Sequence, residues 1–387
     1  QRGNPDVLLR GGLNADSIIV STGKTLKLSG TVTVNDYLEM NGSCSLLSNL
    51  TGTGTLSSAT GNIVVNYTNI ENITAAGGAN FVANNSYDLG GNSGWTINST
   101  SSQYYYWVGD GGDWSDGSHW ALSSGGSGSG CAPTFQDNVY FDANSFSSSG
   151  QTVSISNGAA DCKTIDWTGV TNDPTFDISD DLNVYGSLIF VTNMTLSASG
   201  SSNINLKSTS SGNSVTLGGN ALNAGLIFDG VGGEWDLLDS ISLTNYYRYF
   251  SVSNGTLRTN GNGISCGQFS VQNNSTVDLS SSNITLYGYS CNVSSTNFDA
   301  GTSTILLANS GGTFPGEFNS DNDFHNLVIE SVNNQHTVDG SGSFNRIEQR
   351  GNPDVLLRGG LNADSIIVST GKTLKLSGTV TVNDYLE

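Results

Sequence analysis

The sequence predicts an all-β protein built as a parallel β-solenoid, in which the chain winds in short coils and each coil pairs with the next. Three observations predict this fold. A segment of 39 residues occurs twice without a substitution, short apolar alternations recur along the chain, and polar corner residues separate them. Sandwiches and solenoids both have regular short strands. The return of one phrase within the chain, with many Asn, Ser and Thr residues that can stack at successive corners, favours the solenoid.

The duplicated segment is residues 1–39, which return letter for letter as residues 349–387, an offset of 348 residues. A fixed period is typical of repeat architectures, in which neighbouring units bury the core between them. We interpret the chain as a section of a tandem array of nearly identical repeats. In such an array, the next copy's equivalent of Met40 would follow Glu387. An artificial duplication of one terminus would leave the same pattern. The array predicts the same conformation for both copies.

The charge of the chain indicates an acidic, soluble polymer. Thirteen basic residues stand against 33 acidic ones, which gives a net charge of -20 at pH 7. The duplicated segment carries four residues of each sign, so the whole excess belongs to the unique 348 residues. An excess of this size repels nucleic acid and anionic membranes and attracts divalent cations. Nucleic-acid partners are therefore disfavoured, and insertion into a membrane is too, because no run of 18 apolar residues exists.

The first strands are predicted within residues 7–35, where apolar and polar residues alternate. The alternating pairs are Ile18 and Val20, Leu26 and Leu28, and Val32 and Val34. A period of two marks short, half-buried strands. The same phrase returns at residues 268–279, and looser copies follow the same pattern at residues 250–259, 188–196 and 139–155. The spacing of the phrases predicts coils of roughly 20 to 25 residues, each advancing about 4.8 Å along the axis.

These patterns divide the chain into four segments. Residues 1–100 and 137–348 are predicted to be solenoid, residues 101–136 a junction rich in Trp, Gly and Ser, and residues 349–387 the start of the next identical repeat. The tryptophans of the junction are too close together to lie on separate coils. We expect a hairpin and a loop that fold the indoles over a solenoid end or an adjoining sheet.

The junction opens with WVGDGGDWSDGSHW at residues 107–120, and DNVYFDANSF follows at residues 137–146. With shorter matches that extend to about residue 329, these segments resemble the repeats of very large secreted surface proteins of Bacteroidota. The resemblance implies a tandem-repeat adhesin or filament that is exported by type IX secretion and is not an enzyme. This chain departs from the signature at Asp110 and Asp113, where Gly and Asn are expected.

Composition and resemblance together predict a structural repeat of an extracellular filament or of a giant cell-surface adhesin, which forms a surface fibre or mediates attachment. Its expected partners are copies of itself, in tandem or laterally. The alternative is an adhesin module that binds surface polysaccharide by stacking sugar rings on exposed aromatic side chains. The candidate rings are Tyr104 to Tyr106, Tyr246, Tyr247 and Tyr249.

A β-helix enzyme that degrades polysaccharides is the third alternative. Such enzymes need clustered carboxylates with a basic residue in a cleft. The one adjacent acidic pair, Asp180 and Asp181, has no Arg or Lys near it in sequence, and the three histidines accompany no nucleophile motif. The sequence therefore predicts no enzymatic activity.

A candidate calcium site lies in the junction. Asp110, Asp113 and Asp116 place three carboxylates on one Gly-rich loop, and hard cations take oxygen ligands from such loops. The spacing is not that of an EF-hand, so a solvated acidic turn is the alternative.

The cysteines suggest two disulfides. Cys131 with Cys162, and Cys266 with Cys291, are separated by about one or more strand-turn units. Stacked positions in adjacent coils lie roughly 5 Å apart, which is within bridging reach. The alternative is that they are small buried thiols, and Cys44 is left without a partner on either account.

Two Asp-Ser-Ile triplets, at Ser17 and Ser240, resemble the acceptor of O-linked glycosylation in Bacteroidota. Ser365 repeats the first of them. Glycosylation at these serines is the remaining prediction, although Ile18 is also required for the core.

Overall fold

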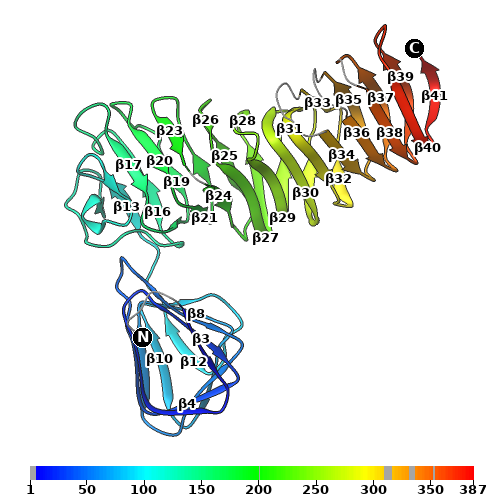
Figure 1. Ribbon diagram of the computed structural model, residues 1–387. Helices are drawn as coiled ribbons and strands as arrows, with labels where there is room; N and C mark the ends of the chain where they lie inside the picture. The colour runs from blue at the N-terminus through cyan, green and yellow to red at the C-terminus, as the bar shows by residue number, and fades with distance from the viewer. Residues whose placement is uncertain (1–5, 200, 309–315, 331–335, 352–353) are drawn as a thin grey trace. The chain divides into compact units, whose positions relative to one another are not determined.

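The computed structural model describes residues 6–199, 201–308, 316–330, 336–351 and 354–387. Within them the chain is all-β and forms a parallel β-solenoid of about 18 turns, as the sequence predicts (Figure 1). One short 3-10 helix in this part of the chain, η1 (Gly117–His119), interrupts the strands. The chain divides into two compact units, Gln1–Ser102 with Gly130–Ala132, and Gln103–Ser129 with Pro133–Glu387.

In the first unit the described strands form three parallel sheets. In order of pairing they are β1 (Val7–Arg10), β3 (Thr25–Ser29), β5 (Ser48–Gly52), β8 (Thr68–Glu71) and β11 (Tyr87–Asp88); β2 (Leu13–Val20), β4 (Thr31–Met40), β6 (Thr55–Ser58) and β9 (Thr74–Gly77); and β12 (Trp95–Asn98), β10 (Asn80–Asn84) and β7 (Asn62–Asn66). Leu26 lies opposite Val7 on one side and Leu50 on the other, so successive coils take 19 and 24 residues. The predicted coil length is close to these values.

The alternation that predicts these strands also builds the core of the first unit. Leu26, Leu28 and Val32 point inward and are buried, while the residues between them face outward. Polar side chains also stack from coil to coil within the strands. Asn69 of β8 donates its Nδ2 hydrogen to Asn49 Oδ1 of β5, in the preceding coil, at 3.0 Å.

The second unit continues the same winding. One sheet pairs β14 (Gly112–Asp113), β17 (Thr152–Ile155), β20 (Thr175–Ile178) and β23 (Thr195–Ala198). The other described strands join in one long sheet: β13 (Tyr104–Trp107), β15 (Trp120–Ala121), β16 (Asn138–Tyr140), β18 (Ala160–Cys162), β19 (Ile165–Asp166), β21 (Leu182–Val184), β22 (Leu188–Ile189), β24 (Asn203–Leu206), β25 (Asn213–Thr216), β26 (Ala221–Leu222), β27 (Gly225–Leu237), β28 (Ile241–Leu243), β29 (Tyr249–Arg258), β30 (Ile264–Asp278), β31 (Asn283–Val293), β32 (Asn297–Asp299), β33 (Thr304–Leu307), β34 (Gly316–Ser320), β35 (Phe324–Ile329), β36 (His336–Gly340), β37 (Ser343–Gln349), β38 (Val355–Gly359), β39 (Asn362–Val368), β40 (Leu374–Gly378) and β41 (Thr381–Leu386).

Long strands join two faces of the solenoid into this one sheet. β27 pairs with β24 through its first residues and with β25 through its last, so it bends around a corner of the coil. β29 stacks on β27 and bends at the same place. Gly255 of β29 has φ +87°, and a Cβ there would lie 2.6 Å from the carbonyl oxygen of Gly230. Glycine is therefore required at this corner.

Aromatic side chains fill the core of the second unit. Phe141 and Trp167 come from successive coils and stack with their ring centroids 3.7 Å apart. Phe250 and Phe269 stack in the same way at 5.8 Å. The strand register places Phe250 opposite Phe269, which confirms that the phrases at residues 250–259 and 268–279 occupy equivalent positions in neighbouring coils.

Candidate functional site

The two copies of the repeated segment form the same strands in the same register. β1 pairs with β3 with Val7 opposite Leu26, and β38 pairs with β40 with Val355 opposite Leu374. β2 pairs with β4, and β39 pairs with β41, with the same irregularity after Ala15 in the first copy and after Ala363 in the second. The prediction that identical sequence gives identical conformation is confirmed for these residues. Residues 1–5 and 352–353 lie outside the described residues.

Side-chain contacts inside the two copies also match. Lys27 Nζ lies 2.8 Å from Asp6 Oδ2, and Lys375 Nζ lies 2.7 Å from Asp354 Oδ2. The corner amide behaves in the same way, because Asn35 donates to Asp16 at 3.1 Å and Asn383 donates to Asp364 at 3.0 Å. Each pair of contacts joins the two coils within one copy, so the segment carries its own register.

The copies differ in the side on which further coils cover them. In the first copy β3 and β4 pair onward with β5 and β6, whereas β1 and β2 are edge strands among the described residues. In the second copy β38 and β39 pair backward with β36 and β37, whereas β40 and β41 end the sheet. The repeated segment is therefore seen with the coils that follow it in the first copy and with the coils that precede it in the second copy.

The tryptophans of the predicted junction form the first layer of the second unit. β13 runs antiparallel to β15, with Trp107 opposite Trp120, and parallel to β16. Trp107, Trp114 and Trp120 are all buried. The His119 ring stacks on Trp107 with the centroids 4.7 Å apart. The expected hairpin that folds its indoles over a solenoid end is therefore present.

The candidate calcium ligands do not converge. Asp110 accepts hydrogen bonds from Ser147 N at 2.6 Å and Ser147 Oγ at 2.9 Å, and these bonds lower the pKa of Asp110. Asp113 accepts from Ser115 N at 2.9 Å, and Asp116 accepts from Ser118 N at 2.9 Å as the cap of η1.

Each of these carboxylates fastens a different turn. No group of three His, Cys, Asp or Glu side chains arranged to hold a metal occurs in the described part of the chain. The structure therefore gives no support to a shared calcium site at Asp110, Asp113 and Asp116, and it favours the alternative of an acidic turn whose carboxylates are hydrogen-bonded within the loop and to neighbouring segments.

Neither suggested disulfide is present, and the alternative of buried thiols holds for Cys162, Cys266 and Cys291. Cys131 is bonded to Cys44, and its segment Gly130–Ala132 belongs to the first unit. Cys162 is a buried free thiol in β18 of the second unit.

Cys266 and Cys291 are also buried free thiols, and the strand register explains why. Cys266 lies opposite Leu286, and Cys291 lies opposite Phe269, because the offset between β30 and β31 changes from 20 to 22 residues across a bulge. The two cysteines therefore occupy different positions in the coil. Burial raises the pKa of both thiols, so they stay protonated and unreactive.

The two candidate glycosylation serines differ in access. Ser240 is exposed in the turn before β28, and its Oγ accepts from Gly263 N at 3.1 Å. Ser17 is exposed in the first copy, but its counterpart Ser365 lies opposite Arg346 of the preceding coil and is 8% exposed. The difference comes from the preceding coil, which pairs with Ser365 and has no counterpart beside Ser17 among the described residues. Glycosylation stays a prediction, and Ser240 is the better acceptor.

Exposed tyrosines form a small platform at the start of the second unit. Tyr104 is 58% exposed, and its ring centroid lies 6.2 Å from that of Tyr140. Tyr106 lies opposite Tyr140 in the strand register and stacks on it, with the ring centroids 5.1 Å apart. Tyr105 between them points into the core. The predicted exposure of aromatic rings therefore holds for Tyr104, and also for Tyr247 and Tyr249 at 64% and 46%. The alternation of β13 sends Tyr105 inward, and Tyr246 is half-buried.

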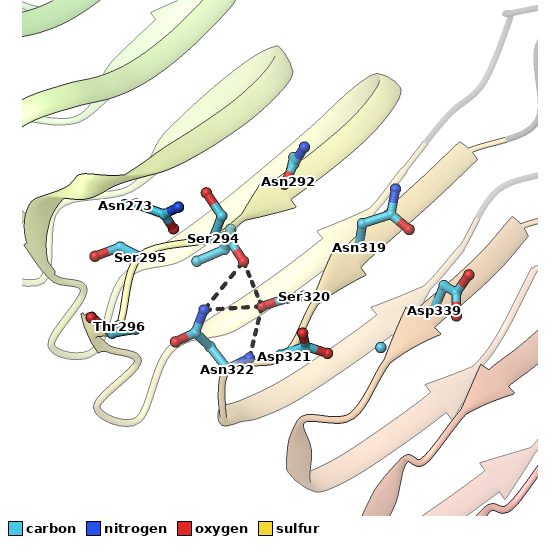
Figure 2. Close-up of a pocket in the computed structure, with 12 residues that line it drawn as sticks. Asn273, Asn292, Ser294, Ser295, Thr296, Asn319, Ser320, Asp321, Asn322 and Asp339 are labelled. Atoms are coloured by element: carbon cyan, nitrogen blue, oxygen red, sulfur yellow. Dashed lines mark hydrogen bonds between the residues drawn. The ribbon is translucent and has the colours of Figure 1, made fainter.

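A polar groove of about 520 Å³ lies along β31, β34 and β36 (Figure 2). Asn292, Asn319 and Asp339 follow one another in register along it. The side chains at its base hold the backbone in place, because Ser320 Oγ donates to Val293 O at 3.0 Å and Asn322 Nδ2 donates to the same oxygen at 3.2 Å. The groove is lined by amide, hydroxyl and carboxylate groups, and its lining residues include no aromatic ring.

Sequence reasoning missed an ion-pair network beside the start of the second copy. Glu348 accepts from Arg350 Nε at 2.6 Å and also pairs with Arg346, and Arg350 Nη1 donates to Glu330 at 2.9 Å. The hydrogen bond from Arg350 lowers the pKa of Glu348. The alternation of Arg346, Glu348 and Arg350 on one strand face was the available signal. The Arg350–Glu330 pair joins neighbouring coils, and the pairs of Arg346 and Arg350 with Glu348 extend the network along one coil.

The acidic pair considered for catalysis is used in coil stacking. Asp180 accepts from Gly158 N at 2.9 Å, and Asp181 accepts from Asn203 N at 2.8 Å. Each carboxylate therefore joins its turn to a neighbouring coil.

Comparisons with models of known families, with curated proteins and with solved structures give no match to this chain. The structure itself defines the fold class, which is the parallel β-solenoid. Among the described residues, no helix is long and apolar enough to cross a membrane.

Proposed function

We propose that this chain is a structural repeat of an extracellular filament or giant cell-surface adhesin, in which copies follow one another in tandem. The observation that carries the proposal is the pair of identical segments in identical register, one open toward preceding coils and the other open toward following coils. In a chain that extends by repetition, each copy of a segment pairs with its neighbouring coils in one fixed register, as these two copies do.

Charge and cysteine chemistry support an extracellular place. The Cys44–Cys131 disulfide fits an oxidising compartment. A net charge of -20 per repeat keeps long chains soluble and apart from one another, and it disfavours nucleic acid as a partner.

Electron microscopy of the native material tests the proposal. Of the 18 turns, about two belong to the second copy, which leaves about 16 turns per repeat. At about 4.8 Å per coil, a repeat advances by at most roughly 75 Å. We expect thin fibres with an axial period at or below this value. Isolated particles of single-repeat size would contradict the proposal.

The tyrosine platform favours carbohydrate binding as a second candidate function. Tyr104, Tyr106 and Tyr140 present stacked, partly exposed rings, which suit the apolar faces of sugars. Binding to a panel of surface polysaccharides, compared between the unchanged chain and Tyr104→Ala, tests this function. Tyr37→Ala is the matched control, because Tyr37 is also an exposed tyrosine, at 45% against 58% for Tyr104, but lies in the first unit. Turnover of a bound polymer would instead support a polysaccharide-degrading enzyme.

A further inference from the structure

We propose that the open end formed by β40 and β41 is a docking surface for a following copy of the same repeat, and that the coil corresponding to β5 and β6 of that copy occupies it. This inference rests on the proposed tandem array and names its interface. We call the surface the C-terminal face and define it by the inward side chains of its two strands: Leu374, Leu376, Val382 and Leu386.

Burial identifies the C-terminal face as an unfinished core. Leu376 is 56% exposed, whereas Leu28, the same residue of the first copy, is 0% exposed. Leu386 is 62% exposed, whereas its counterpart Leu38 is 4% exposed. Because the backbone register is the same in both copies, the difference comes from the missing following coil.

The opposite end shows the complementary pattern. Leu13 of the first copy is 38% exposed, and its counterpart Leu361 in the second copy is 1% exposed beneath β37. Outward residues provide an internal control, since Tyr37 and Tyr385 are 45% and 50% exposed. The repeated segment therefore changes its burial only where a neighbouring coil is present or absent.

The geometry of the docked state is already present in the first copy. There Leu26 lies opposite Leu50, and Val32 lies opposite Leu56. β40 and β41 repeat the positions of β3 and β4, so the same coil of another copy can pair with them in the same register. This is continuity with an observed interface and requires no new contact.

A glycine makes the surface selective. Gly52 has φ +129°, and a Cβ on it would lie 2.1 Å from the carbonyl oxygen of Leu28. The carbonyl of Leu376 occupies the equivalent place on the C-terminal face. An occupant must therefore bring a glycine to this point, which a following copy of the repeat does.

One consequence concerns where the structural unit begins. If the C-terminal face is covered in this way, the solenoid runs through the sequence junction without a break. It starts at Gln103, where the Trp107 hairpin forms its first layer, and it ends at the residue equivalent to Ser102 in the next copy. The folded unit then begins 102 residues after the start of the repeat in the sequence.

Thiol labelling tests the docking. Leu376→Cys is prepared in the 387-residue chain and in the same chain extended after Glu387 by a further copy of residues 40–387. We expect the thiol at position 376 to react at least about 100-fold more slowly in the extended chain, because labelling there requires local opening of paired strands. Tyr385→Cys is the control and should react at the same rate in both chains. The native thiols are buried and give a low background.

Equal labelling rates of position 376 in both chains would overturn the docking. The proposed fibre would not be affected by that result, because electron microscopy tests it separately. In the extended chain, replacing the added copy's equivalent of Gly52 by Ala should restore fast labelling, and protection that survives this change would also count against the inference. Labelling of the 387-residue chain itself should not depend on its concentration, because β5 and β6 of a separate chain are already paired with that chain's own β3 and β4. Slower labelling at higher concentration would show that a different surface covers the C-terminal face and would count against this occupant.

Discussion

His336 is expected to make the stability of the solenoid depend on pH. It begins β36 and is 1% exposed, and within the described residues neither ring nitrogen has a hydrogen-bond partner. Burial disfavours the charged imidazolium and lowers the pKa of His336 from 6.5 to about 4. Replacing the ring by an apolar side chain of similar size, His336→Leu, should remove this dependence.

The sign follows from proton binding. Because the pKa of His336 is lower in the folded state than in the unfolded state, the unfolded state binds more protons between pH 6.5 and about 4. The stabilisation is complete above pH 6.5 and is lost progressively as the pH falls through this window. The difference between the two pKa values corresponds to roughly 3 kcal/mol at the acid end.

Urea unfolding at pH 4.5, 5.5, 6.5 and 7.5 measures the effect. The unchanged chain should lose free energy of unfolding relative to His336→Leu as the pH falls, and the gap should close above pH 6.5. His325→Leu is the matched control, because His325 lies in the neighbouring coil and is partly exposed. Parallel pH profiles for the unchanged chain and His336→Leu would refute the reasoning, since the remaining dependence would then belong to carboxylates.

Three further predictions concern stability. Trp167→Ala should cost roughly 3 to 5 kcal/mol, because the indole is fully buried in the aromatic core, and the loss should appear as a lower midpoint in near-UV circular dichroism. Removing the Cys44–Cys131 disulfide with Cys131→Ser should destabilise the first unit by roughly 2 to 5 kcal/mol, and peptide mapping of the unreduced, unchanged chain should show this bridge and no other. Gly52→Ala should destabilise the first unit by more than Gly61→Ala. Both glycines have positive φ, but only at Gly52 would a Cβ lie against the backbone of a neighbouring coil. Equal losses of stability in thermal unfolding would show that φ alone sets the cost.

The winding of the chain was predictable because its physical signal is local. Inward residues such as Leu26 and Leu28 recur with a period of two, and the phrase that pairs Phe250 with Phe269 is visible as a repeat in the sequence. Stacking between coils then follows from matching apolar positions. The same reasoning explains why both copies of the repeated segment adopt one conformation.

Site predictions failed where they depended on register or on long-range placement. A bulge between Cys266 and Gln268 changes the coil length by two residues, and spacing alone does not reveal it. Cys131 lies 87 residues after its partner in the sequence, so no local pattern joins them. Asp110 bonds to Ser147, 37 residues away, which removes it from any shared cation site.

The equal register of the two copies has a consequence for how such a chain can change in length. Insertion or deletion of whole units of 348 residues returns the chain to the same strand, the same inward residues and the same Gly52 at every junction. An insertion of one residue within a strand would instead turn the apolar side chains that follow it to the wrong face. Recombination between identical copies can therefore lengthen or shorten the protein in whole steps while every junction remains folded.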